Sequence, residues 1–343
     1  MSAGAKSDVG RVLDMINGYQ RTCVLVAALQ LGVFEQLAKS PATTADLARA
    51  IGADPRSLER LVRALRVLGL VELGDGGVAL TGAGKLLLAG GFGAGMRAWA
   101  LLVGEEYLPA WTNLRHSVKT GEIAFDEVFG TNAWTHRREH PELNECFNIV
   151  TSGVQLRTIS ALLAAYDFSK LGCLVDVGGG HGNLVAGVLK KHARARGVVF
   201  DQPHVVEGAP AALEKAGVRD RCEIVGGSFL ESVPSGGDVY VLKHVLHNWD
   251  DTDCVTILRN CRAAMGPSTA ILVLENVIPD GDVKGADALV MLDLHMMAVL
   301  GGRERTLAEY RALFDEAGFR FTRCIATREG APSILEAENP AAT

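Results

Sequence analysis

Short apolar runs that alternate with helical stretches from residue 172 onward constrain the fold more than any other feature of the sequence. The runs are CLVDV, GVVFD, CEIVGGSF, DVYVLKHV, AILVLEN, FRFTRCIAT and APSILEAEN. Strands separated by helices predict βαβ crossovers and a mostly parallel sheet that is covered on both faces. Ligands of such sheets bind outside the carboxyl ends of the strands. We therefore expect an α/β, Rossmann-like doubly wound sheet with its functional residues at those ends.

A glycine-rich turn, DVGGGHGN, follows the first predicted strand, where a doubly wound sheet places its ligand loop. The glycines read G-x-G-x-G, but Asn183 stands where the dinucleotide fingerprint needs a further glycine. The turn also lacks the Lys followed by Ser or Thr that a phosphate-binding P-loop requires. Taken alone, these glycines fit an ordinary turn as well as a ligand loop.

Polar residues follow the next two predicted strands. Asp201 ends the second strand, where a carboxylate can accept hydrogen bonds from two ribose hydroxyls. Ser228 and Phe229 follow the third, where a hydroxyl and an aromatic ring could hold an adenine or simply end the strand. With Asp201 next to the glycine turn in such a sheet, the sequence favours a nucleoside-containing ligand.

Residues 1–90 predict a winged helix-turn-helix. Thr43 or Thr44 can cap a short helix that Gly52 ends, Asp54 begins a second helix, and LVEL and VAL form a small hairpin. The second helix carries four arginines, Arg56, Arg60, Arg63 and Arg66. This face could read a DNA groove, or it could be a solvated packing face.

Two further segments precede the predicted sheet. Residues 9 to 38 carry more apolar side chains at helical spacing than a solvent-facing helix needs, which predicts a contact with another chain. Residues 91–165 read as a mainly helical connector, with a long helix from Pro141 to about Ala165.

Charge and cysteine content exclude several classes of protein. The 343 residues have a formal net charge of −6 and no run of five basic residues, so neither nucleic acid nor membrane is expected as a partner. The seven cysteines are scattered without a CxxC pair and predict reduced thiols in a cytoplasm. No apolar stretch approaches the roughly 20 residues that span a bilayer, and the N-terminus lacks the apolar core of a signal peptide.

Five motifs together, DVGGGHG, FDQPHV, GGSF, LKHVLHNW and GGRERT, resemble the S-adenosylmethionine-dependent O-methyltransferases of the caffeic-acid and hydroxyindole type, including bacterial members that act on natural products. The resemblance covers nearly the whole chain. It implies a winged-helix dimerisation domain over 1–90, a connector over 91–165 that contributes to the substrate pocket, and a class I catalytic domain over 166–343. The expected protein is a cytoplasmic homodimer of secondary metabolism or antibiotic biosynthesis. It methylates a phenolic hydroxyl of a small aromatic acceptor and uses S-adenosylmethionine but no metal.

The resemblance also implies individual cofactor contacts. They fall on Gly178 in the glycine turn, Asp201 at the ribose, Ser228 and Phe229 at the adenine, and Lys243 at the end of the fourth strand. Family members commonly have Asp where Ser228 stands, so this adenine contact is expected to be weaker or rearranged.

The family's general base falls on His247, and the carboxylates that hold its ring fall on Glu275 and Glu304. Asn248 replaces the Asp often found after this His, which leaves the base itself intact. His244 is a second histidine near the same strand end, and it fits a structural role as well as a chemical one.

The segment ALVMLDLHMMAVLGG carries methionines at helical spacing that fit either core packing or a pliable wall against a flat acceptor. On the second interpretation, Met291, Asp293 and His295 contact the substrate. Two alternative functions stay open at this point. One is a ligand-sensing winged-helix transcription regulator, and the other is a cofactor-binding relative that does not methylate.

Overall fold

The computed structural model describes residues 7–90, 93–327 and 331–340, and the chain forms two compact units. Unit 1 comprises Met1–Leu114 with Phe125–Gly153, and unit 2 comprises Arg115–Ala124 with Val154–Thr343. Two predictions fall partly outside the described residues. The expected lack of a signal peptide rests partly on residues 1–6, and the connector is predicted to begin at residue 91.

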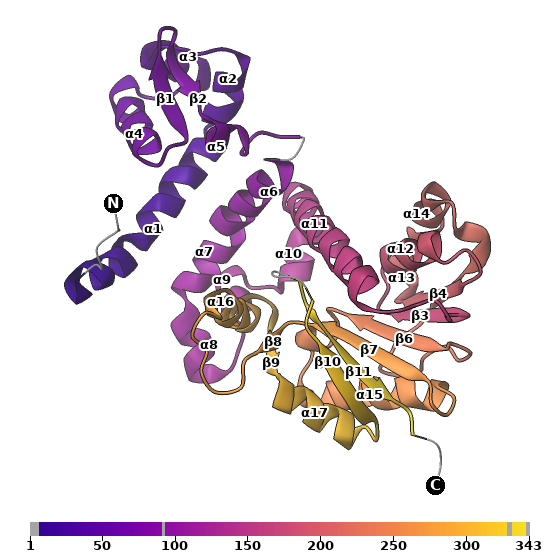
Figure 1. The fold of residues 1–343 in the computed structure, drawn as a ribbon. Helices are drawn as coiled ribbons and strands as arrows, with labels where there is room; N and C mark the ends of the chain where they lie inside the picture. Colours follow the sequence, from indigo (N-terminus) through magenta and orange to yellow (C-terminus); the bar gives the residue numbers. More distant parts are fainter. Residues whose placement is uncertain (1–6, 91–92, 328–330, 341–343) are drawn as a thin grey trace. The chain divides into compact units, whose positions relative to one another are not determined.

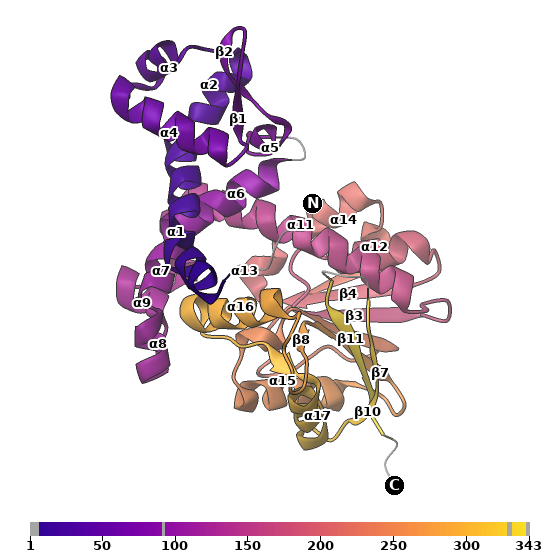
Figure 2. The ribbon, with the colours of Figure 1, turned by 60° about the vertical axis from the view of Figure 1, so that its left-hand side comes forward.

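The N-terminal part of unit 1 has the predicted helix-turn-helix and hairpin (Figure 2). Its elements are α1 (Asp8–Gln30), α2 (Val33–Lys39), α3 (Thr44–Ile51), α4 (Pro55–Val67), β1 (Val71–Gly74), β2 (Gly77–Leu80) and α5 (Gly82–Lys85). Thr43 caps α3 by accepting a hydrogen bond from Asp46 N, and Asp54 caps α4 by accepting one from Ser57 N. The apolar stretch over residues 9 to 38 is divided at Gly32, whose φ of 72° separates α1 from α2.

Helices fill residues 94–165, as predicted. They are α6 (Ala94–Leu102), a π-helical turn (Val103–Tyr107), α7 (Leu108–Thr112), α8 (Leu114–Thr120), α9 (Ala124–Phe129), α10 (Ala133–Glu139) and α11 (Pro141–Ala165). Within unit 1, the buried guanidinium of Arg137 donates to the buried Glu106 carboxylate at 2.7 and 3.0 Å and lies 4.1 Å from the centroid of the Phe147 ring. This pair satisfies two charges that would be costly to bury alone.

Unit 2 contains a seven-stranded sheet with the strand order β10-β11-β7-β6-β3-β4-β5 (Figure 1). The strands are β3 (Cys173–Val177), β4 (Arg196–Asp201), β5 (Cys222–Gly226), β6 (Val239–Lys243), β7 (Ala270–Glu275), β10 (Arg320–Ile325) and β11 (Ser333–Glu338). Strands β3 to β7 of this sheet pair in parallel, whereas β11 is antiparallel to both β7 and β10. The prediction of a mostly parallel doubly wound sheet is confirmed.

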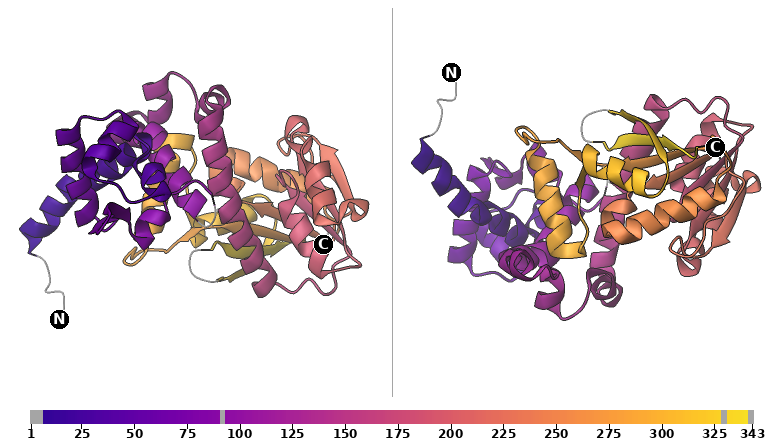
Figure 3. Two further views of the ribbon diagram at one scale, coloured as in Figure 1. Left: turned by 90° about the horizontal axis from the view of Figure 1, so that it is seen from above. Right: turned by 90° about the horizontal axis from the view of Figure 1, so that it is seen from below.

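Alternate residues of the central strands enter two separate hydrophobic cores, one on each face of the sheet. Tyr240 and Leu242 pack with α15 (Asp251–Ala264) and α17 (Leu307–Glu316), which lie side by side in the right-hand view of Figure 3. Val241, between them, packs in the second core. That core also receives the end of α11, α12 (Asn183–Lys191) and α14 (Ala209–Ala216). A strand covered on both faces is apolar throughout, which explains the unbroken apolar runs in the sequence.

A short parallel pair, β8 (Val277–Ile278) with β9 (Arg305–Thr306), joins two distant segments of unit 2. Its register pairs Val277 with Arg305. The residues just before the two strands therefore come together, with Glu275 before β8 and Glu304 before β9. Between them run α16 (Asp287–His295) and a π-helical turn (Met296–Leu300). Smaller elements are α13 (Pro203–Val206) and the 3-10 turns Arg219–Arg221 and Leu246–Asn248.

In the described part of the chain, none of the helices is both long enough and apolar enough to cross a membrane on its own. The bent pair α1 and α2 meets that test together, by length and composition only.

Candidate active site

Most of the predicted site residues of unit 2 lie at or just after the carboxyl ends of five neighbouring parallel strands, β7, β6, β3, β4 and β5. Parallel strands end at one edge of the sheet, which brings together loops that are far apart in the sequence. The glycine turn follows β3, Asp201 ends β4, Lys243 ends β6 and Glu275 ends β7.

The glycine turn between β3 and α12 needs its glycines for conformation and for space. Gly178 and Gly180 have φ angles of 75° and 57°, a left-handed conformation that other residues adopt only at a cost. A Cβ on Gly178 would come within 2.8 Å of the Val245 side chain and 3.8 Å of the Phe229 ring. The Gly180 N–H donates to Asp201 Oδ2 at 2.9 Å. The structure thus brings Gly178, Asp201 and Phe229 together, as expected of one ligand site.

A carboxylate that the sequence-based site prediction missed lies beneath this turn. Asp176 is completely buried, and neither of its carboxylate oxygens has a hydrogen-bond partner among the residues that the structure describes. Burial raises its pKa to about 7, although the charge of Lys243 works in the opposite direction. Burial also lowers the pKa of Lys243, although Asp176 and Glu275 oppose that shift. The sequence signal that could have identified Asp176 is the presence of an acid in the otherwise apolar run CLVDV.

Asp176 provides the test of whether a cofactor with a cationic amino-acid end fits here. A buried carboxylate without partners is costly, and an ammonium group that donates to it would remove much of that cost. The bare glycine backbone above it leaves room, because Gly179 could not carry a Cβ without approaching the Asp176 carboxylate to 2.9 Å. The donor set around the turn therefore fits the amino-acid end of S-adenosylmethionine.

Phe229 and Ser228, the two residues predicted at the adenine, make different kinds of contact. The Phe229 ring lies edge-on to Trp249, with centroids 5.7 Å apart, and its backbone carbonyl accepts a hydrogen bond from Asn260. The Ser228 hydroxyl accepts a hydrogen bond from Leu230 N at 3.3 Å and so caps the turn after β5. Phe229 is thus positioned beside the glycine turn, while Ser228 has a local structural role.

His247, the predicted base, lies between the two predicted carboxylates. Its Nδ1 is 3.1 Å from Glu304 Oε1 and 3.8 Å from Glu275 Oε2, and its backbone N–H donates to Glu275 Oε1 at 3.3 Å. Both carboxylate side chains are fully buried. Burial by itself would lower the pKa of His247, but the negative charges of Glu275 and Glu304 outweigh it and raise that pKa above its ordinary value.

Two residues hold the backbone of the His247 turn from behind. The buried guanidinium of Arg305 donates to the carbonyls of Leu246 and Trp249 at 2.9 and 2.7 Å. Gly302 lies so close to the turn that a Cβ there would be 2.1 Å from the His247 carbonyl oxygen. The GGRERT motif therefore supplies both a carboxylate and the support that fixes the base.

The second histidine, His244, lies beside the same carboxylate. Its Nδ1 is 3.6 Å from Glu275 Oε2, and its ring centroid is 5.4 Å from that of His247. Its backbone has a φ of 52°, which is unusual for a residue other than glycine. Its Nε2 is buried and has no hydrogen-bond partner among the described residues.

The residues predicted to contact the substrate lie on α16. Asp293 Oδ1 accepts a hydrogen bond from Glu304 N at 2.8 Å, which ties α16 to the carboxylate beside His247. Met291 is 55% exposed, and His295 is the last residue of the helix. Met296 in the following turn is buried, as the core-packing interpretation expects. Whether Met291, Asp293 and His295 touch an acceptor stays a prediction.

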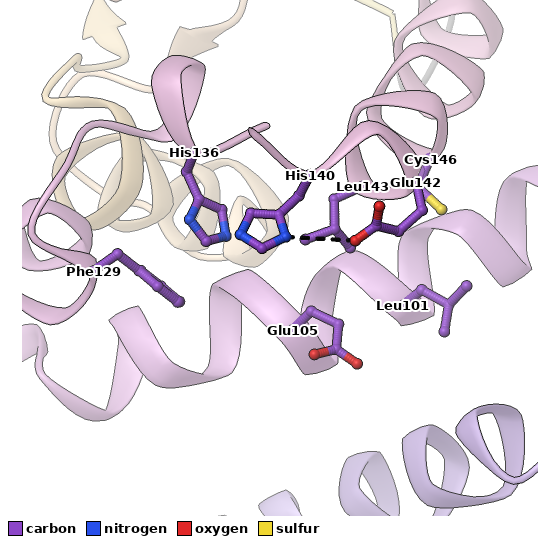
Figure 4. Close-up of a pocket in the computed structure, with 8 residues that line it drawn as sticks. All are labelled: Leu101, Glu105, Phe129, His136, His140, Glu142, Leu143 and Cys146. Carbon is purple, nitrogen blue, oxygen red and sulfur yellow. Dashed lines mark ion pairs between the residues drawn. The ribbon is translucent and has the colours of Figure 1, made fainter. Parts of the chain in front are cut away.

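A separate cavity of about 450 Å³ lies among the helices of unit 1. It is lined by Leu101, Glu105, Phe129, His136, His140, Glu142, Leu143 and Cys146. Figure 4 shows the rings of His136 and His140 facing each other, with His140 Nδ1 3.5 Å from Glu142 Oε1. None of the residues predicted from the sequence to form the active site lines this cavity.

Family comparisons cover both parts of the chain. Residues 111–320 match the model of the O-methyltransferase domain, and residues 13–90 match the O-methyltransferase dimerisation domain. Phenazine O-methyltransferase PhzM of Lysobacter antibioticus is 39% identical over 335 residues, which are 98% of this chain and 97% of that protein.

Solved structures give the same result. The mitomycin 7-O-methyltransferase MmcR superposes with a TM-score of 0.85 at 36% identity, over 96% of each chain. The O-methyltransferase NcsB1, solved with S-adenosyl-L-homocysteine and 1,4-dihydroxy-2-naphthoic acid, gives a TM-score of 0.80 at 33% identity, over 92% of this chain and 95% of that one.

Proposed function

The chain belongs to the family of S-adenosylmethionine-dependent O-methyltransferases, and we propose that it methylates a phenolic hydroxyl of a small natural product with His247 as general base. The observation that carries the proposal is the position of His247. It lies between two buried carboxylates and two residues after Val245, whose side chain would be 2.8 Å from a Cβ on Gly178 of the glycine turn. Base and cofactor loop are thus neighbours within unit 2.

The cofactor would be held by the residues around the glycine turn. We assign the backbone of Gly178 and the carboxylate of Asp176 to its amino-acid end, Asp201 to the ribose, and Phe229 to the adenine. Lys243 would balance the charge of Asp176. Ser228 has no carboxylate to offer the adenine, and its hydroxyl already caps the turn after β5.

When bound, S-adenosylmethionine supplies an electrophilic methyl group on its sulfonium. The task of the protein is to hold an acceptor oxygen in line with that group and to take its proton. An ordinary phenol pKa of about 10 and a histidine pKa of about 6.5 make this proton transfer uphill by about 3.5 units, or about 5 kcal/mol. Glu275 and Glu304 narrow the gap because their charges favour the imidazolium form of His247. We infer that His247 receives the proton at Nε2 while Nδ1 stays on Glu304.

The acceptor class follows from the names of the relatives. PhzM is a phenazine O-methyltransferase, MmcR acts in the mitomycin series, and NcsB1 was solved with a dihydroxynaphthoic acid. We propose a flat aromatic acceptor from an antibiotic-like pathway, with Met291, Asp293 and His295 on one wall of its pocket. The three-part division of the chain, in which 91–165 contributes to that pocket, is part of the same proposal.

We propose further that the protein acts as a cytoplasmic homodimer. The dimerisation domain matches residues 13–90. Helix α1 exposes a row of large apolar side chains, Val9, Val12, Leu13, Met15, Ile16 and Tyr19. A helix of this kind is more stable against a second chain than in water. The match of this region to a dimerisation domain favours an interface between two copies of the chain over the alternative of a DNA-reading regulator.

The test is methylation of a phenol panel that includes 1,4-dihydroxy-2-naphthoic acid, followed by mass spectrometry. His247→Ala should lower the rate by about 100-fold or more, because a general base is lost. Binding of S-adenosylhomocysteine, measured by calorimetry, should be unchanged. His192→Ala, after the far end of α12, is the control and should keep full activity. Normal cofactor binding with no methylation of any phenol would contradict the proposal and favour the non-methylating alternative.

A further inference from the structure

Three side chains at the ends of β6 and β7 each place one ligand atom around a common point. Nδ1 of His244 and Nδ1 of His247 lie 3.6 and 3.8 Å from Glu275 Oε2. One such atom from each residue lies within 4.8 Å of the other two. In a tetrahedral zinc site the ligand atoms are about 3.3 Å apart, since the bonds to zinc are about 2.0 to 2.2 Å long. Small side-chain movements would therefore give a metal-binding arrangement.

Two buried atoms of this cluster, Glu275 Oε2 and His244 Nε2, lack hydrogen-bond partners within residues 7–90, 93–327 and 331–340. Glu275 has no exposed surface, and the distances of its Oε2 from Nδ1 of His244 and of His247, 3.6 and 3.8 Å, are longer than hydrogen bonds. The backbone keeps His244 in place although its φ is left-handed, because its N–H donates to Leu274 O and its carbonyl accepts from Asn248. Glu275 Oε2, which has no hydrogen bond in the described structure, and His244, whose backbone is held beside it, are two independent reasons to expect a cation.

We propose that His244, His247 and Glu275 bind one exchangeable transition-metal ion of the Zn²⁺ type, and that the bound ion inhibits methyl transfer. The binding stands by itself. The inhibition rests on the proposed function, in which His247 is the general base.

The ligand set determines the class of ion. Two imidazoles and one carboxylate suit Zn²⁺, Co²⁺, Ni²⁺ and Cu²⁺, whereas Mg²⁺ and Ca²⁺ prefer all-oxygen ligands. The ion can enter from solvent, because the side chains of His244 and His247 are 18% and 15% exposed. Glu304 Oε2 is also buried and has no hydrogen-bond partner in the described part of the chain, so this carboxylate is available to neutralise the second positive charge of the ion.

The same geometry indicates an exchangeable ion and not a resident one. A histidine in a permanent metal site donates its second ring N–H to a carboxylate, carbonyl or water. In the described part of the chain, Nε2 of His244 has no such partner. We therefore expect moderate affinity that a chelator reverses.

Inhibition follows from the valence of the imidazole ring. A neutral histidine has one ring nitrogen with a free lone pair and one that carries hydrogen. If the ion takes the lone pair of His247 Nδ1, the proton is on Nε2, and that nitrogen can no longer accept a proton from the acceptor hydroxyl. The proton that Nδ1 held against Glu304 moves to Nε2, so the ion and the proton of the acceptor hydroxyl compete for the single lone pair of the ring.

Binding can be measured without any methylation. The full-length protein would be titrated with Co²⁺, and the visible absorption of four-coordinate Co²⁺ recorded. We expect one ion per chain, displaced by Zn²⁺ but not by Mg²⁺. His244→Asn suits the left-handed backbone and removes one ligand. This variant should weaken Co²⁺ binding by at least about tenfold, because even the loss of a residue that is hydrogen-bonded to a metal ligand has an effect of that size.

The matched control is His140→Asn, because His136 and His140 are the other close histidine pair in the described structure. This variant should bind Co²⁺ as the unmodified protein does. Loss of the visible band in His140→Asn but not in His244→Asn would overturn the proposal. A near-ultraviolet thiolate band would also overturn it, since it would assign the ion to cysteines.

Activity assays separate the two parts of the proposal. Zn²⁺ should inhibit methylation by the unmodified protein and by His140→Asn, EDTA should restore it, and His244→Asn should need at least about tenfold more Zn²⁺ for half-inhibition. Co²⁺ binding without detectable methylation would mean that the proposed function fails while the metal site stands. Equal Zn²⁺ inhibition of the unmodified protein and His244→Asn would refute the metal site and leave the methyltransferase in place.

Discussion

At the scale of single residues, the buried carboxyl of Asp176 combines a cost in stability with a reason to bind a cation. Its pKa of about 7 means that it holds its proton in the folded chain over a range where the unfolded chain has lost it. A group whose folded-state pKa is raised in this way favours folding least at high pH. The same unmet carboxylate is what makes the glycine turn attractive to an ammonium group.

We predict that the protein without cofactor loses stability as the pH rises through the range between about 4 and 7. The folded state binds more protons than the unfolded state there, and the full effect is about 4 kcal/mol at most. Asp176→Asn should flatten the dependence of the unfolding free energy on pH in this range. It should raise that free energy more at pH 8 than at pH 5. Urea unfolding of both proteins at pH 5 and pH 8 measures these unfolding free energies. Equal pH slopes in both proteins would show that Asp176 titrates normally.

At the scale of elements, the His247 turn depends on a segment that is remote in sequence. Strand β9 carries Arg305, whose guanidinium holds the turn carbonyls, and Gly302 leaves the space into which the turn packs. The pairing of β8 with β9 brings Glu304 to the end of β7. The geometry of the proposed catalytic group is thus a property of two strands and one turn acting together.

We predict that Gly302→Ala lowers the rate of methylation by about 100-fold, because a 1 Å displacement of a catalytic group has effects of that size. The new Cβ would be 2.1 Å from the His247 carbonyl oxygen, so the turn must move. Gly95→Ala in α6 is the matched control, because among the described residues nothing outside the local helix backbone lies within 4 Å of the added Cβ. Steady-state kinetics and cofactor binding would be compared. A rate equal to that of the control would show that the turn can shift without harm.

At the scale of the whole molecule, the surface that we propose for assembly is the exposed apolar face of α1. The face lies in unit 1, in the region that matches the dimerisation domain. Such a row is costly in water and stabilising against a second chain. The expected homodimer therefore has a specific surface that can be changed without touching the core.

We predict that Ile16→Glu weakens the dimer and shifts the protein towards monomers. Ile16 is 62% exposed, so the change should affect association and not the fold of the chain. Val118→Glu, at a 68% exposed position on α8, is the control and should leave the dimer intact. Sedimentation velocity over a concentration series distinguishes the two. Identical sedimentation of both variants would place the interface elsewhere.

The family resemblance, and not local chemistry, pointed to Lys243, His247, Glu275 and Glu304. The sequence by itself determined the fold class, a helix cap at Thr43 or Thr44 and another at Asp54, and a glycine turn with Asp201 at the end of the next strand. These follow from periodicity and local chemistry, which are properties of neighbouring residues. Only the tertiary structure showed that Asp176 has no partner and that His244 shares the carboxylate of His247. It also showed that Asp293 supports Glu304. The physical reason is that these contacts depend on which distant segments pair across the sheet and β8–β9, and burial and charge balance exist only after that pairing.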